Sequence, residues 1–263
     1  MDAEIELEGG RVTEGVVRVG DTVRRRTGPW TPTVHAYLRH LESRGFGGAP
    51  RVLGLDERGR EILTHLEGEV PSSSSWTRGH ATRLPEPALR DEALVAVGRL
   101  IRSLHDAAAD FVPDDPIWRE HAYPPVGGEI VCHGDLGPHN TVYRDGEPVA
   151  FVDWDGARPD DPLLELGHAA WWFVPLADDA YCAEMGFASP PDRGARLRLL
   201  ADAYGAARPD VLELVREAKQ REAERPRYWP GMTAAGAAQF LRHVVRELEW
   251  LAANEEALRR ALA

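Results

Sequence analysis

Lysine is almost absent from this chain of 263 residues. Lys219 is the only one, so nearly all of the 31 Lys and Arg residues are arginine. The formal net charge is −12, which argues against nucleic acid as a partner, because binding a phosphate backbone needs a basic surface. An acidic balance suits either a cationic small-molecule partner or plain solubility.

Cysteine and long apolar runs are also scarce. Cys132 and Cys182 provide no disulfide framework, which favours a reducing compartment. No stretch is long and apolar enough to span a membrane, and residues 1–4 are acidic and lack a signal-peptide pattern. We therefore expect a cytoplasmic protein that has no membrane partner.

The centre of the chain carries two polar segments, each placed directly after a short apolar strand. The first contains His133, Asp135 and Asn140, and the second begins at Asp153. Between them, two strand-like pieces flank Asp145-Gly146, a dipeptide typical of a tight β-hairpin. A hairpin folds its ends together, so we expect Asp135, Asn140 and Asp153 to converge on one side of one small sheet.

Such a set of side chains fits phosphoryl transfer from a nucleotide. One carboxylate orients the attacking hydroxyl and accepts its proton, while an amide oxygen and a second carboxylate hold Mg²⁺ on the phosphates. Histidine, aspartate and asparagine also gather in ordinary turns, where their side chains bond nearby backbone groups. That reading accounts for Asp145-Gly146 but not for the joint spacing of the other residues.

The run from His133 to Asn140, followed after the hairpin by Asp153-Trp154-Asp155, resembles the aminoglycoside phosphotransferase family. The later run from Asp161 to Gly167, of pattern Asp-Pro-x-x-Glu-Leu-Gly, resembles it as well. This family of small-molecule kinases has a protein-kinase-like fold. The resemblance implies an α+β chain in two lobes, with a small antiparallel sheet at residues 1–66 and a mostly helical lobe at residues 67–263.

The resemblance also implies roles for the central residues. Asp135 would be the base, and His133 would brace the catalytic loop through hydrogen bonds. Mg²⁺ would be held by Asn140 and Asp153, and the phosphoryl donor would be ATP or GTP. For the acceptor side the alternatives stay open: metal contact or a turn cap for Asp155, a pocket wall or solvent for His139, and an amine contact or a solvated surface for Asp160 and Asp161.

In the first lobe, the glycine-bearing turn with Gly9 and Gly10 would approach the nucleotide phosphates. Relatives normally carry a lysine on the third strand, paired with a glutamate on the next helix. Here Arg25 is the expected substitute, with Arg24 or Arg26 as alternatives, and His35 stands where the glutamate is expected. By the same resemblance, the backbone of Thr64, His65 and Leu66 would meet the base of the nucleotide.

The favoured function is transfer of the γ-phosphoryl group to a hydroxyl of a small, possibly cationic acceptor, such as an aminoglycoside-like antibiotic or a metabolite. One alternative is a catalytically weak kinase relative that binds nucleotide, because the lysine and its glutamate partner are missing. The other is a metal-dependent hydrolase that would use His133, Asp135, His139 and Asp153. Both antibiotic resistance and metabolism are compatible roles.

Apolar spacing predicts the remaining elements. Helices are expected from Pro32, capped by Thr31, to Gly45, and along the apolar stripe 89–104. Further helices are expected at 163–172, at about 194–206 and 210–224 and from Thr233 to the end, and the segment 156–162 is expected to be a loop.

Overall fold

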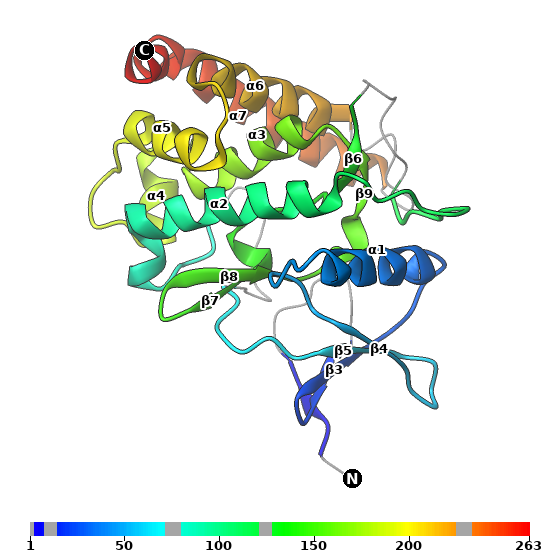
Figure 1. Ribbon diagram of the computed structural model, residues 1–263. Coiled ribbons are helices and arrows are strands. Elements are labelled where there is room, and N and C mark those ends of the chain that lie inside the picture. The colour runs from blue at the N-terminus through cyan, green and yellow to red at the C-terminus, as the bar shows by residue number, and fades with distance from the viewer. Residues whose placement is uncertain (1–2, 8–14, 72–79, 121–127, 225–232) are drawn as a thin grey trace.

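The computed structural model describes residues 3–7, 15–71, 80–120, 128–224 and 233–263. Within them a small antiparallel sheet forms one end of the molecule and helices form the other, with helix α1 between the two (Figure 1). The expected α+β fold with two lobes is therefore confirmed. Gly9 and Gly10 lie outside the described residues, and the lobe boundary after residue 66 stays a prediction.

The sheet of the first lobe is built from five short strands in the order β1-β2-β3-β5-β4. Their bounds are Ile5–Glu6 for β1, Val17–Val19 for β2, Thr22–Arg25 for β3, Val52–Leu55 for β4 and Glu61–Thr64 for β5. Along β5 the side chains alternate, and Glu61 and Leu63 are the buried pair. Strand β5 lies beside β3, and the register sets Glu61 directly opposite Arg25.

Helix α1, Thr31–Ser43, lies between β3 and β4 in the chain and packs against both the sheet and the second lobe. Pro32 lies in its first turn, where a missing N–H costs nothing, and the chain turns away at Gly45 with a φ of +79°. The residue at the N-terminal boundary is Trp30, so Thr31 lies inside the helix and the cap expected at Thr31 is wrong. Tyr37 on this helix is buried and donates a hydrogen bond to the carbonyl of Val131.

The central hairpin consists of β7, Thr141–Arg144, and β8, Glu147–Phe151. Asp145 and Gly146 have φ angles of 52° and 81°, the two positive values that a tight hairpin turn needs, so this prediction is confirmed. The chain leaving β5 joins this hairpin through an antiparallel bridge between Glu69 and Tyr143.

One strand, β9, was not predicted from the sequence. Strand β6, Ile130–Cys132, pairs with β9, Arg158–Asp160, so the segment expected to be a loop contains a strand. Strand β6, which leads to His133 and Asp135, and the β7–β8 hairpin consequently belong to two separate two-stranded sheets and not to one. A strand of three residues that includes a proline shows too little alternation to be recognised from sequence.

Helices make up most of the second lobe. Their bounds are Asp91–Ala108 for α2, Pro162–Phe173 for α3, Asp179–Met185 for α4, Arg193–Tyr204 for α5, Arg208–Glu224 for α6 and Ala234–Leu262 for α7. Helix α2 packs on α5, and α6 packs on α3 and α7 (Figure 1). Along the described part of the chain, no helix combines the length and the apolar character needed to cross a membrane.

The core reaches directly beneath the two polar segments. Leu136, Phe151 and Trp154 are almost completely buried and belong to the same apolar cluster as Tyr37 of α1. These side chains flank the polar residues in sequence, so the core fixes the backbone from which Asp135 and Asp153 project.

Candidate active site

His133 fixes the backbone of the loop that follows β6. It is fully buried, its Nε2 lies 2.9 Å from the carbonyl oxygen of Val152, and its Nδ1 accepts the N–H of Asp135 at 3.3 Å. Burial lowers the pKa of His133, so the ring is neutral. A neutral ring with a proton on Nε2 satisfies both bonds, and the bracing hydrogen bonds expected for this residue are present.

Asp135 and Asn140 are brought together by this loop. The Asn140 amide nitrogen donates to the main-chain carbonyl of Asp135 at 2.9 Å and to its carboxylate at 3.0 Å. The Asp135 side chain is 36 % exposed, and His139 lies 3.7 Å from its carboxylate. Asn140 is buried, and neither bond uses its amide oxygen, the atom that suits a hard cation.

Asp153 is tied to the same loop through the backbone. The N–H of Val152 donates to the carbonyl of Asn140 at 2.9 Å, so the two polar segments are joined directly before Asp153. Asp153 itself has a φ of 60°, a left-handed conformation that is rare outside glycine and gathers at functional sites. Its side chain is 45 % exposed and lies 3.2 Å from Arg25.

Arg25 is buried and also contacts two further carboxylates, those of Glu61 and Asp155. Asp155 forms a second ion pair, with Arg119, at a distance of 3.0 Å. Burial raises the pKa of Asp155, and the charge of Arg25 opposes that rise. Asp155 is thus engaged by two arginines, and the two roles considered for it, metal contact or turn cap, stay predictions.

Glu165 lies on α3 and anchors the catalytic loop, which we define as residues 133–140. It is buried and accepts the N–H of Gly134 at 2.6 Å, the N–H of His133 at 3.3 Å and a hydrogen bond from His105 at 2.9 Å. Burial alone would raise the pKa of Glu165, but the bonds from His105 and the loop lower it to about 2. The motif contained this residue, but its role depends on contacts that the motif does not show.

A metal site at His105, Cys132 and Glu165 is conceivable from distance, since one ligand atom of each lies within 4.8 Å of the others. The nitrogens of His105 already bond Tyr204 and Glu165, each at 2.9 Å. Burial raises the pKa of the Cys132 thiol well above its usual range. This cluster is therefore a hydrogen-bonded core, and His105 is a core histidine.

The acidic residues expected near an acceptor have other partners. Asp160 lies 2.8 Å from Arg221, and Asp161 caps α3 by accepting the N–H of Leu163 at 2.8 Å. The ring beside Asp135 is that of His139, which in turn meets the edge of Trp172 with centroids 6.0 Å apart.

The lone lysine is not part of this site. Lys219 on α6 is completely buried and pairs with Glu222 at 2.8 Å and Glu247 at 3.0 Å. Its ammonium also lies 4.4 Å from the ring centroid of Trp171 and 5.0 Å from that of Trp172. Lys219 therefore stabilises the packing of α6 against α3 and α7.

The backbone of residues 64–66 was expected to meet a nucleotide base, and two of its N–H groups already donate hydrogen bonds within the chain. The N–H of Thr64 donates to Arg51 at 3.0 Å and that of His65 donates to Asp21 at 2.8 Å. Among the described residues, none accepts the N–H of Leu66. That these three residues meet a nucleotide base stays a prediction.

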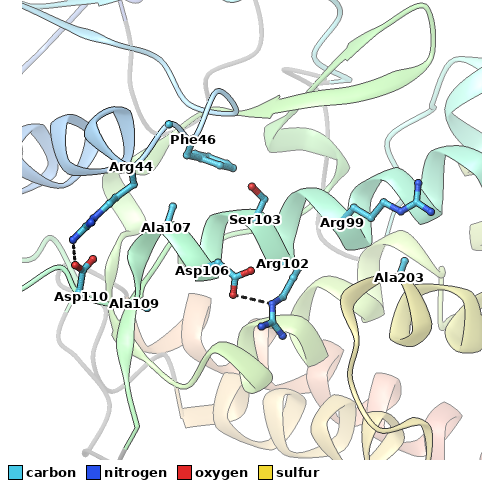
Figure 2. Close-up of a pocket in the computed structure, with 11 residues that line it drawn as sticks. Arg44, Phe46, Arg99, Arg102, Ser103, Asp106, Ala107, Ala109, Asp110 and Ala203 are labelled. Carbon is cyan, nitrogen blue, oxygen red and sulfur yellow. Dashed lines mark hydrogen bonds and ion pairs between the residues drawn. The ribbon is translucent and has the colours of Figure 1, made fainter.

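One small and one larger cavity are lined by residues that the structure describes. A crevice of about 40 Å³ adjoins Gly134 and is lined by Asp160, His168 and Arg221 among others. A larger cavity of about 590 Å³ lies between the end of α1 and α2, and Figure 2 shows Arg44 with Asp110 and Arg102 with Asp106 paired along it. Among the residues that the structure describes, none that we expected in the active site lines the larger cavity.

Gly134 is required by the geometry of the loop. Its φ is +83°, and a Cβ there would lie 2.1 Å from the carbonyl oxygen of Gly156. We expect Gly134→Ala to lower the free energy of unfolding by about 2–4 kcal/mol, since left-handed strain and overpacking add. Gly45→Ala is the control, because Gly45 has a φ of +79° but open space around it. Urea denaturation of both variants measures the difference, and equal losses would contradict the steric argument.

Comparisons with known proteins found matches in both sequence and structure. A sequence model of the phosphotransferase enzyme family matches residues 115–200. The trifolitoxin immunity protein of Rhizobium leguminosarum bv. trifolii is 39 % identical over 213 residues, which cover 79 % of this chain and 76 % of that protein.

Solved structures share the fold. An ethanolamine kinase from Plasmodium vivax is similar with a TM-score of 0.58 and 9 % identity, covering 100 % of this chain and 84 % of that one. The GDP complex of aminoglycoside 2'-phosphotransferase-IIIa is similar with a TM-score of 0.52 and 13 % identity, covering 96 % and 93 % of the two chains. Identities this low show the fold alone.

Proposed function

Since the chain belongs to the phosphotransferase enzyme family, we propose that it transfers the γ-phosphoryl group of a nucleoside triphosphate to a hydroxyl of a small molecule. The contact between Asp135 and Asn140, with Asp153 tied to the same loop, is the observation that carries this proposal. It combines one carboxylate for the acceptor with two oxygen ligands for a metal.

On the donor side, ATP or GTP would lie with its phosphates at Arg25 and its base at the backbone of Leu66. The carboxylate of Asp153 and the amide oxygen of Asn140 fit Mg²⁺, which prefers hard oxygen ligands. When bound, Mg²⁺ supplies charge neutralisation at the β- and γ-phosphates. The charge of Arg25 acts in the same sense, because a guanidinium can bind two phosphate oxygens.

On the acceptor side, Asp135 would orient the attacking hydroxyl and accept its proton as the phosphoryl group transfers in line. Asn140 fixes the carboxylate of Asp135, and His133 fixes the backbone that carries it. Positioning and electrostatic stabilisation supply most of the rate in this chemistry.

Both alternative functions lose support. A hydrolase site would need His133 as a metal ligand, but both of its ring nitrogens already bond the backbone. A catalytically weak relative was motivated by the missing lysine and helix glutamate, yet Arg25 keeps the positive charge and Glu61 supplies a carboxylate partner.

The acceptor is proposed to be a small molecule that is harmful to the cell. One relative is the trifolitoxin immunity protein, and phosphorylation of a hydroxyl is one way to inactivate a toxic compound. Asp160 and Asp161 are engaged by other groups, so His139 and Trp172 are the proposed contacts of the acceptor.

Nucleotide binding through Asp153 is tested by thermal unfolding with ATP and with GTP, each with and without Mg²⁺. At a nucleotide concentration 100 times Kd, binding adds about 2.7 kcal/mol, and we expect the Tm of the wild type to rise by about 5–10 °C with Mg²⁺. Asp153→Ala should abolish the Mg²⁺-dependent part of this rise.

Asp145→Ala is the matched control, because Asp145 is also an aspartate with a positive φ, 52°, but lies exposed in the hairpin turn. It carries the same backbone strain and should keep the full rise. The proposal is wrong if neither nucleotide raises the Tm of the wild type.

A further inference from the structure

Arg25 uses each of its three guanidinium nitrogens for a different carboxylate. Its Nε contacts Glu61, its Nη1 lies 3.2 Å from Asp153, and its Nη2 contacts Asp155. A lysine offers one nitrogen at the end of a flexible stem and cannot reach three acids in these fixed directions. The fixed geometry of the three guanidinium nitrogens therefore gives a physical reason for arginine at this position.

The three contacts differ in how far they are open to solvent. The side chains of Glu61 and Asp155 are 2 % and 7 % exposed, whereas that of Asp153 is 45 % exposed. Water and solutes reach only the contact with Asp153. Phosphate oxygens can accordingly replace Asp153 at Nη1 while the two buried contacts hold the rest of the guanidinium.

Glu61 is itself held in place. It lies directly opposite Arg25 in the register of β3 and β5, and its second oxygen accepts a hydrogen bond from His35 of α1 at 2.7 Å. Burial would raise the pKa of Glu61, but the bond from His35 and the charge of Arg25 lower it below its ordinary value. Glu61 is thus a charged group with both oxygens engaged.

From this geometry we infer that Glu61, held by His35, positions Arg25 for the phosphates of the nucleotide. Strand β5 supplies the anionic partner, and the helix that follows β3 contributes a histidine that orients this partner. This inference rests on the proposed function. It assigns Glu61 and His35 as positioning residues, which act through Arg25 and do not touch the nucleotide.

Nucleotide and nucleoside binding separate this role from a merely structural one. A nucleoside has the base and the sugar but no phosphates, so its affinity does not depend on Arg25. We expect Glu61→Gln to weaken binding of MgADP or MgGDP at least about tenfold while adenosine or guanosine binding stays within about twofold. Isothermal titration calorimetry measures all four.

Glu42→Gln is the matched control, because Glu42 forms an exposed pair with Arg51 in the same lobe and should leave all four affinities unchanged. His35→Leu gives a second reading should Glu61→Gln fail to fold, with the same selective loss expected.

Two outcomes overturn the inference alone. In one, the wild type binds MgADP or MgGDP and Glu61→Gln binds it equally well. In the other, the variant loses nucleotide and nucleoside affinity to the same extent, which indicates a structural role. A wild type that binds neither nucleotide overturns the proposed function, and the inference falls with it.

Discussion

Replacing Asp135 with asparagine should reduce phosphoryl transfer by about a hundredfold to ten-thousandfold. This range is the typical contribution of a general base, and an asparagine amide cannot accept the proton of the acceptor hydroxyl. The substitution keeps the size of the side chain. The amide oxygen of the new asparagine can accept the same hydrogen bond from Asn140, so the loop should keep its shape.

The turnover of Asp135→Asn can be measured before the acceptor is identified. Hydrolysis of ATP or GTP uses water as the acceptor, and the same variant is tested on any hydroxyl compound that stimulates nucleotide consumption. MgADP and MgGDP affinities should stay within about twofold of the wild type, because Asp135 acts on the acceptor side. Asp145→Asn is the control for a lost carboxylate outside the site. Unchanged turnover in Asp135→Asn would remove the proposed base.

The parts of this site that the sequence predicted are those carried by local signals. Asp145-Gly146 predicts its hairpin because both residues tolerate positive φ, and the hairpin then brings Asn140 and Val152 into contact. The family resemblance supplied the roles of Asp135 and Asp153. Those roles stay predictions, while the structure places the amide nitrogen of Asn140 3.0 Å from the carboxylate of Asp135.

The parts that were missed depend on pairing between distant segments. Glu61 could be recognised as the partner of Arg25 only once β3 and β5 are aligned in register. The strand Arg158–Asp160 is defined by its partner β6, and its own three residues give no clear period. Arg119 joins Asp155 from a loop that sequence patterns do not place.

Glu165 shows how a recognised motif can hide its physical role. The sequence placed it on a helix that follows the segment beginning at Asp153, and α3 confirms this helix. Its importance comes from burial together with two backbone N–H groups of the catalytic loop, which only the fold brings to it. Loss of the charge of Glu165 should therefore destabilise the folded protein.

Glu165→Gln should lower the free energy of unfolding by about 3 kcal/mol at pH 7. The pKa of Glu165 falls from an ordinary 4.5 to about 2 on folding, and each unit of pKa is worth about 1.4 kcal/mol. Because the folded pKa is the lower one, this stabilisation is fully present above about pH 4.5 and is lost as pH falls toward 2. Urea denaturation at pH 7 and at stepwise lower pH measures it, with a drop in Tm of about 6–12 °C as a second readout.

Glu213→Gln is the control that decides whether burial causes this effect. Glu213 on α6 also has a lowered pKa, through its bonds to Arg259 and Arg216, but its side chain is 50 % exposed. Exposed ion pairs contribute about 0–1 kcal/mol, so its loss should be small at every pH. The stability gap between wild type and Glu165→Gln should close on acidification, since protonated Glu165 is as uncharged as glutamine. A gap that stays constant down to pH 3 would mean that packing of the side chain, and not its charge, anchors the catalytic loop.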